Sequence, residues 1–268
     1  MILNIKNTLF ASTLALVLGC APDEKQTVTT MNQLVKQDEF NVDGAPDSSM
    51  WSYDIGTGNN GWGNKELEYY TNRSQNIKIE GGVLKITAIK ENYMGSAYTS
   101  ARIISKGKFE QKHGRFEARI KMPWGKGIWP AFWMLGSNSS TVGWPQCGEI
   151  DIVEYLGNNP TSMFGTIHGP GYSGANSLSK VFNLTNDRFD TGFHIFGIEW
   201  GEDYINYYVD NVLYYQVTPA NAPGEWVFNQ PFYMILNLAV GGNLPGSPNQ
   251  QTTFPQTMQV DYVRVYQK

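Results

Sequence analysis

The chain has 268 residues, of which 41% are hydrophobic, 13% aromatic and only 16% charged. The net charge is −4 and the 20 Lys and Arg form no basic run, which argues against nucleic acid as a partner. Two cysteines cannot build a disulfide framework, and no Cys/His cluster has the spacing of a structural zinc site, so a hydrophobic core must hold the fold. Many aromatic and few charged residues suit a neutral, hydroxyl-rich ligand such as a sugar.

Residues 1–19 have the features of an export signal. Lys6 precedes an apolar run from Leu9 to Leu18, which is too short for a membrane-spanning helix of about 20 residues. The run ends in Val17-Leu18-Gly19-Cys20, which resembles the lipobox of bacterial lipoproteins, where the cysteine becomes the acylated first residue. The resemblance implies lipidation at Cys20 and an outer-membrane lipoprotein. The alternative is a plain cleavable signal and a secreted protein.

Residues 20–36 are polar after the cysteine and are predicted to be a tether, and residues 37–268 are predicted to form one all-β domain. No long segment outside the signal has helical periodicity with caps. Asp210-Asn211 is predicted to be a hairpin turn, because both residues tolerate positive φ. The pattern favours a two-sheet antiparallel sandwich or jelly roll. The expected strands are short alternating runs at 83–89, 116–121, 194–200, 204–209, 212–217, 233–238 and 260–266.

Three carboxylates interrupt one strongly β-forming segment, Glu149-Ile-Asp-Ile-Val-Glu154. Side chains alternate along a strand, so Glu149 and Asp151 share a face. Glu154 would point to the opposite face unless a β-bulge at Ile152 or Val153 returns it, and bulges are common beside active sites. The sequence therefore predicts a bulged strand that presents three acids on one face.

The alternative interpretation is an edge strand whose acids face solvent, which is the commoner reason for charges in a strand. The β-branched aliphatic residues between the acids and the tryptophans just upstream disfavour it. Three like charges so close together should raise the pKa of at least one carboxyl, which separates an acid from a base. Neighbouring carboxylates on one strand favour a retaining glycosidase over an inverting one, because an inverting pair lies further apart.

Trp129, Trp133 and Trp144 all come shortly before this segment in the sequence. Their flat indole faces suit the apolar faces of sugar rings. Trp129 and Trp133 are four residues apart and share a strand face, so we expect at least one in a cleft. The alternative for each is a place in the core.

Asn64, Glu66 and Arg102 are polar residues within β-like segments and are candidates for hydrogen bonds to sugar hydroxyls. A surface salt bridge is the alternative for Arg102. His113 and His194 have no functional context and are predicted to be structural, and Cys147 is predicted to be a buried thiol.

At Glu149-Ile-Asp-Ile-Val-Glu154 the chain resembles glycoside hydrolase family 16, retaining endo-glycanases with a concanavalin-like jelly roll. The resemblance covers roughly residues 37–268 and is closest to the laminarinase branch, the endo-β-1,3-glucanases. It implies that Glu149 is the nucleophile, Glu154 the general acid/base, and Asp151 the carboxylate that orients them. The other matching motifs are Gly61 to Thr71, Ser100 to Ile103, Ile128 to Leu135, Trp144 to Gly148, Ile167 to Tyr172 and Asn237 to Asn243.

The same resemblance implies that His168 lies beside the carboxylates and that Asn243 contacts substrate, although a lone histidine is more often structural. Leu244-Pro245-Gly246 stands where many laminarinases have Trp-Pro-Gly, so one wall of the cleft should be less aromatic. No cofactor is expected for catalysis. Relatives often hold a structural calcium ion, for which the matching positions are Glu39, Gly82 through its carbonyl, and Asp261.

The sequence thus predicts a β-glucan hydrolase that cuts internal β-1,3 linkages, in a monomer. Two alternatives remain open: hydrolysis of mixed-linkage glucan or of an algal galactan such as agarose or carrageenan, and a non-catalytic β-glucan-binding protein on the same fold.

Overall fold

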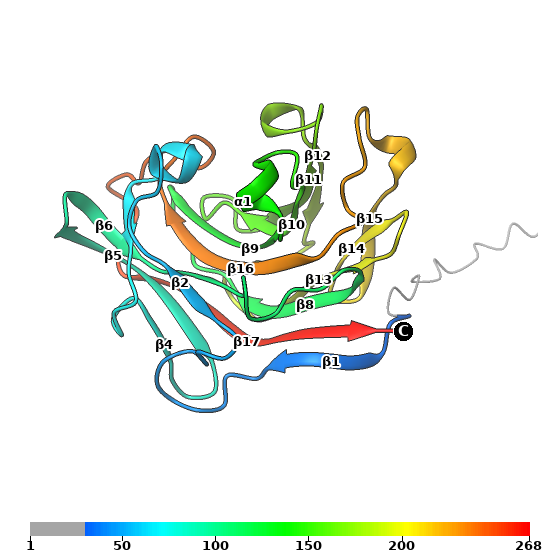
Figure 1. Cartoon of the computed structure of the whole chain (residues 1–268). Helices are drawn as coiled ribbons and strands as arrows, with labels where there is room; N and C mark the ends of the chain where they lie inside the picture. Colours follow the sequence, from blue (N-terminus) through cyan, green and yellow to red (C-terminus); the bar gives the residue numbers. More distant parts are fainter. Residues whose placement is uncertain (1–29) are drawn as a thin grey trace, which may run out of the picture.

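Two β-sheets stack on each other in the computed structural model, which describes residues 30–268 (Figure 1). All strand pairs are antiparallel except β3 with β6. The ten-stranded sheet runs β15 (Val212–Val217), β14 (Ile205–Val209), β13 (His194–Trp200), β8 (Gly114–Lys121), β17 (Gln256–Gln267), β5 (Leu84–Tyr93), β6 (Ser96–Ser100) and β3 (Glu68–Tyr70), while β1 (Gln33–Asp38) pairs with β17 and β4 (Ile77–Ile79) with β5. The seven-stranded sheet runs β12 (Leu178–Asn183), β11 (Ser162–His168), β10 (Glu149–Tyr155), β9 (Ile128–Gly136), β16 (Phe232–Val240), β7 (Arg102–Ile104) and β2 (Ser52–Asp54).

The helical segments in the described part of the chain are single turns. They are α1 (Ser139–Val142), η1 (Gly61–Lys65), η2 (Gly174–Asn176) and η3 (Pro219–Asn221). The predicted all-β sandwich is confirmed, and so is the hairpin between β14 and β15, where Asp210 and Asn211 have φ of 48° and 66°. Two positive φ values are what a two-residue hairpin of the right twist requires.

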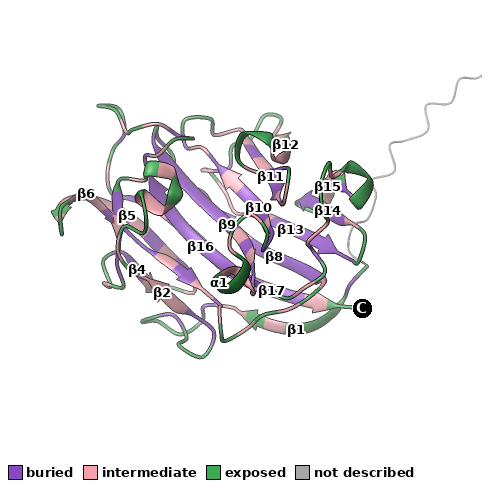
Figure 2. Cartoon of the chain, turned by 45° about the horizontal axis from the view of Figure 1, so that its top comes forward, coloured by how far each residue is buried: buried purple, intermediate pink, exposed green. Residues whose placement is uncertain are grey.

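The core lies between the sheets and is formed by the inward side chains of both. In β8, Phe116, Ala118 and Ile120 are fully buried, and every residue of β16 is buried (Figure 2). One face of β16 meets the core, and Asn237 on the other face lines a cleft. Its run of apolar residues is interrupted by Asn237, a polar group on the cleft side.

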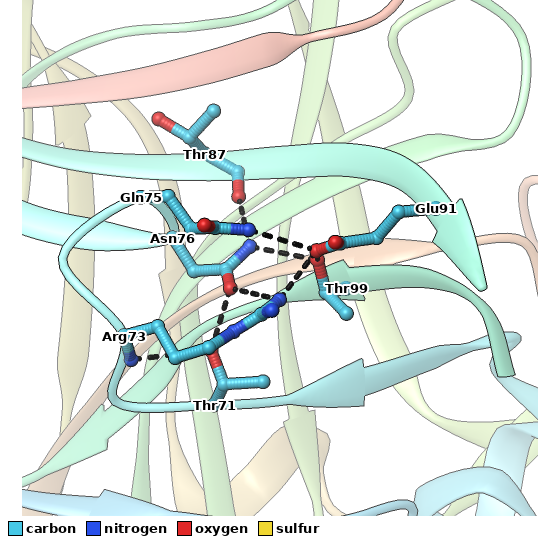
Figure 3. A network of polar contacts seen from close by, with 7 residues as sticks. All are labelled: Thr71, Arg73, Gln75, Asn76, Thr87, Glu91 and Thr99. Carbon is cyan, nitrogen blue, oxygen red and sulfur yellow. Dashed lines mark hydrogen bonds and ion pairs between the residues drawn. The ribbon is translucent and has the colours of Figure 1, made fainter. Parts of the chain in front are cut away.

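A buried polar network holds the corner where β3, β5 and β6 meet (Figure 3). Asn76 lies at its centre and donates to the Thr87 carbonyl at 3.1 Å and to Thr99 Oγ1 at 2.9 Å. The hydroxyl of Thr71, just after β3, donates to Asn76 Oδ1 at 2.6 Å. Since buried polar groups are stable only when paired, these bonds fix β3 against its neighbours.

The domain begins earlier than predicted. Residues 33–36, which we assigned to the tether, belong to β1, and the backbone N–H groups of Thr30 and Met31 donate to Glu199. β1 gave no alternating signal because it is an edge strand whose side chains are mostly exposed, and backbone pairing with β17 holds it. The predicted signal and Cys20 lie outside the described residues. Within 30–268, no helix is long and apolar enough to cross a bilayer.

Candidate active site

The bulge predicted in the acidic strand is present in β10. Asp151 pairs with Trp133 of β9 and Val153 with the next residue along, Phe132, so one residue of β10 is extra. The register with β11 shifts over the same segment, between Asp151 and Glu154. Ile152 and Val153 are both buried in the core, and Glu149, Asp151 and Glu154 all line the same cleft. The local sequence therefore puts three acids on one face, as predicted.

The cleft has a volume of about 1010 Å³ and crosses the seven-stranded sheet. The carboxylates lie midway along it: β9, β16 and β7 form the floor on one side of β10, and β11 and β12 form it on the other. Such a cleft has room for ligand on both sides of the carboxylates.

All three carboxyl groups have raised pKa values. Burial and the neighbouring Asp151 charge raise the pKa of Glu149 to about 8, and burial raises the pKa of Asp151 to about 8. Burial, followed by the charges of Asp151 and Glu149, raises the pKa of Glu154 well above its usual range. Burial thus lets Glu154 hold its proton to a higher pH than a solvent-exposed glutamate does, which suits a general acid.

His168, the last residue of β11, lies beside two of the carboxylates as the family resemblance implied. Its Nε2 is 3.2 Å from Asp151 Oδ2 and 3.6 Å from Glu149 Oε1. Its Nδ1 accepts a hydrogen bond from the Gly174 N–H at 3.1 Å, so the ring proton is on Nε2 and faces the acids.

The three tryptophans predicted for the cleft all line it. Trp129 Nε1 donates to Glu154 Oε1 at 3.1 Å, and Trp133 Nε1 donates to Asn237 Oδ1 at 2.7 Å. Trp144 is 49% exposed, and its ring centre lies 5.8 Å from that of His168. Trp144 thus offers an exposed indole face for a sugar ring, and a hydrogen bond from its side chain lowers the pKa of Glu149. Trp129 and Trp133 likewise bond to polar groups of the cleft.

Arg102 lines the cleft and makes the salt bridge considered as its alternative. Its Nε is 2.9 Å from Asp54 Oδ2, but this pair is largely buried rather than at the surface. The guanidinium lies between two indoles, 4.5 Å from the ring centre of Trp62 and 4.9 Å from that of Trp133. These contacts hold Arg102 in one position at the cleft wall.

Asn64, Glu66 and Asn243 come together where two loops meet, and all three line the cleft. The Asn243 N–H donates to the Asn64 carbonyl at 2.7 Å, and the Leu67 N–H donates to the Val240 carbonyl at 2.8 Å. Substitution of Gly241, which has φ of 73°, would drive a Cβ into Leu67, so glycine permits this close approach.

Sequence reasoning missed several residues of the cleft. Trp62 has a left-handed backbone conformation (φ 52°), and no sequence pattern predicts this conformation for a tryptophan. Asn237 was detectable as a lone amide within an apolar strand, but its partners are distant in sequence. Leu244, from the segment we expected to be less aromatic, also reaches the cleft. The remaining missed residues that line the cleft are Asn59, Gly63, Ala131, Leu135, Phe164, Thr166, Gly174, Ala175, Ser177 and Ser179.

The positions expected to bind calcium have other partners. Glu39 accepts two bonds from Arg264, at 2.7 and 2.8 Å, and Asp261 accepts one from Arg119 at 2.7 Å. These guanidinium groups supply positive charge to both carboxylates, and calcium binding at Glu39, Gly82 and Asp261 stays a prediction. Among residues 30–268, the three-residue group with the spacing of metal ligands is Glu149, Asp151 and His168, in the cleft itself.

The chain is similar to known proteins both in sequence and in structure. The sequence profile of the glycosyl hydrolases family 16 matches residues 62–264. The chain is 40% identical to a beta-glucanase of Rhodothermus marinus over 94% of this chain and 92% of the relative. The structure is similar to the laminarinase catalytic domain from Thermotoga maritima, with a TM-score of 0.84 and 49% identity over 88% of this chain and 98% of the other.

An endo-beta-1,3-glucanase from Pyrococcus furiosus is similar to the same degree, with a TM-score of 0.84 and 48% identity over 87% of this chain and 94% of the other. The matched region contains the bulged strand and nearly all of the cleft. From its sequence, its jelly-roll fold and its three carboxylates, the chain belongs to glycosyl hydrolase family 16.

Proposed function

We propose that the protein hydrolyses internal β-1,3 linkages of β-glucans such as laminarin, with retention of anomeric configuration. The observation that carries this is the position of Glu149 and Glu154 on one face of β10, midway along an open cleft. A cleft lined on both sides of the carboxylates accommodates sugars on either side of the scissile bond, as an endo-acting enzyme requires.

The first half of the reaction uses both glutamates. Glu149 attacks the anomeric carbon while Glu154 gives its proton to the leaving glycosidic oxygen, so one C–O bond forms and one breaks. The raised pKa of Glu154 keeps that proton available, and Asp151 lies between the two acids on the same strand face. The leaving sugar departs with the proton, and a glycosyl ester on Glu149 remains.

The second half returns the enzyme to its starting state. Glu154, now ionised, takes a proton from water as the water oxygen attacks the anomeric carbon, and the ester bond to Glu149 breaks. Two inversions at one carbon give net retention. The Trp129 indole N–H, which is bonded to Glu154 Oε1, favours the ionised form needed at this point.

Product analysis tests this function. Wild-type protein is incubated with laminarin, lichenan and agarose in parallel, the products are sized, and the first anomer formed is identified by NMR. We expect laminarin oligosaccharides of mixed length with β configuration. Glu149→Ser should abolish turnover and still bind laminarin. Activity on agarose alone, an initial α anomer, or full activity in Glu149→Ser would reject the proposal.

We also infer that the protein is exported and tethered to the outer membrane through Cys20, and that the domain is a monomer. The lipobox-like Val17-Leu18-Gly19-Cys20 supports the anchor, and the ten residues from Cys20 to Thr29 could span at most about 36 Å when extended. Labelling with a fatty acid and membrane fractionation test the anchor. If Cys20→Ser leaves the protein unchanged in the membrane fraction, the anchor is not the cysteine. Light scattering of the purified protein tests the monomer.

A further inference from the structure

We infer that Glu68 is a neutral carboxylic acid that donates its proton to Glu66 and thereby positions the Glu66 carboxylate in the cleft. This inference rests on the proposed function, because Glu66 is a candidate sugar-binding group. It assigns a role to a buried acid that the reaction itself does not use. Glu68 does not line the cleft, so it is a positioning residue.

The surroundings of Glu68 favour the neutral form. The residue is 1% exposed, and its Oε2 accepts a hydrogen bond from the Val240 N–H at 2.7 Å. Its Oε1 is shielded from solvent and receives no donor from the described residues. Burial of an ionised carboxylate oxygen without a hydrogen-bond donor costs folding free energy. The same oxygen can donate a hydrogen bond when it carries a proton.

The available acceptor is Glu66, two residues earlier in the chain, whose side-chain hydrogen bond with Glu68 lowers the pKa of Glu66 and raises that of Glu68. Two carboxyl groups can share such a bond only when one of them is protonated. Glu66 is the better anion of the two, because it accepts from the Tyr70 hydroxyl at 3.0 Å and from Asn64 Nδ2 at 3.4 Å. Its neighbour Arg102 also favours a negative charge there.

A chain of bonds fixes the direction of the Tyr70 donor. Trp133 Nε1 can only donate, and it occupies Asn237 Oδ1. Asn237 Nδ2 then donates to the Tyr70 hydroxyl oxygen at 3.2 Å, so the Tyr70 hydrogen is directed to Glu66 Oε2. Every member of this chain has its partner, and its last acceptor is Glu66. Glu68 supplies the remaining donor from below the cleft surface.

The electrostatics agree with this assignment. Burial, followed by the charge of Glu66, raises the pKa of Glu68 well above its usual range. Burial also raises the pKa of Glu66, but Arg102 and the hydrogen bonds from Glu68 and Tyr70 lower it. The titratable groups that face the pair are Tyr70 and Arg102. An ionised Glu66 held in this way can only accept, so it selects ligands with hydroxyl donors, such as a glucan.

Two variants of Glu68 test the inference on laminarin. Glu68→Gln keeps one acceptor for the Val240 N–H and one N–H donor for Glu66, whereas Glu68→Leu removes both. We expect Glu68→Leu to raise KM roughly tenfold, the loss from one hydrogen bond to a charged group, with a smaller change in kcat. Glu68→Gln should recover most of that loss. A tenfold rise in KM in Glu68→Gln would overturn the inference.

Infrared difference spectra provide a second readout that does not depend on Glu68→Leu folding. At pH 7, wild type minus Glu68→Gln should show the C=O stretch of a protonated carboxyl. A lost carboxylate band in its place means that Glu68 is ionised and overturns the inference. Wild-type protein that does not cut laminarin would reject the proposed function instead, while the infrared result would still report the state of Glu68.

Discussion

The backbone N–H of Gly174 donates to Nδ1 of His168, and this bond turns the proton on the opposite ring nitrogen toward Asp151 and Glu149. The loop that contains Gly174 follows β11, so a backbone group outside the catalytic strand decides which histidine tautomer the acids meet. His168 lowers the pKa of Glu149, which is otherwise raised by burial and by Asp151. The ring therefore lowers the pH at which the nucleophile becomes ionised.

Removal of this ring should slow catalysis. For His168→Ala we expect kcat to fall about 10- to 100-fold, the range for a lost polar contact to a charged group. The acidic limb of the kcat/KM profile should move to higher pH, because Glu149 would bind its proton more tightly. Steady-state kinetics from pH 4 to 10 measure both effects. His113→Ala is the matched control, and an equal fall in that variant would mean that the effect is not specific to the cleft.

Removal of the Asp151 charge should shift the acidic limb of the kcat/KM profile to lower pH, opposite to the effect of His168→Ala. Asp151 raises the pKa of Glu149 through its charge, so Asp151→Asn should move the acidic limb of kcat/KM to lower pH. Activity should also fall, because Asp151 lies between the two reacting glutamates. The same pH series measures this shift. An acidic limb that stays in place or moves upward in Asp151→Asn would contradict the assigned coupling.

The hydrogen bond from Trp129 to Glu154 should affect the alkaline limb of the pH–rate profile. In the wild type, the hydrogen bond from the Trp129 indole N–H lowers the pKa of Glu154. Trp129→Phe keeps an aromatic face but removes this N–H. Loss of the N–H should raise the pKa of Glu154, which moves the alkaline limb to higher pH, and should reduce kcat about threefold to tenfold. Trp124→Phe is the control, since the Trp124 side chain is largely exposed and does not line the cleft. Identical alkaline limbs in Trp129→Phe and wild type would exclude this role.

The buried acids should reduce stability as the pH rises. The pKa of Glu149 is about 8 in the folded protein and ordinary in the unfolded chain, so its contribution to stability is present below about pH 4.3 and is lost as the pH rises toward 8. Glu149→Gln cannot ionise. Its Tm should therefore match wild type near pH 4 and exceed it at pH 8, by about 2–4 °C for each kcal/mol relieved.

Calorimetry at both pH values measures this difference in Tm. Glu202→Gln, at an exposed position, is the control and should show no such dependence on pH. A Glu149→Gln protein less stable than wild type at pH 8 would show that the buried acid has stabilising partners in the folded state.

The catalytic strand could be predicted from the sequence because its signal is local. Strand periodicity, the spacing of Glu149 and Glu154, and two adjacent core residues are enough to require a bulge. Arg102 was predicted as a polar group in a strand, but its position between Trp62 and Trp133 depends on a strained loop and on a different strand. No local pattern contains that information.

Partners distant in the chain explain the other differences. Asp261 is correctly placed in the terminal strand, but its neighbour Arg119 comes from β8, and sequence spacing does not pair them. β1 was missed because an edge strand needs only backbone bonds on one side. Glu68 was not singled out in the sequence, because its partner Val240 is distant in the chain.

The bulge in β10 has a consequence for how this strand can change in length. In a regular strand, deletion of one residue moves every later side chain to the opposite face. Here the extra residue lies between Asp151 and Glu154, so deletion of Ile152 or Val153 would remove the irregularity and leave the terminal glutamate on the cleft face. The catalytic strand can therefore exist in two lengths that both present three acids to substrate, and the shorter one places the last acid closer to the first.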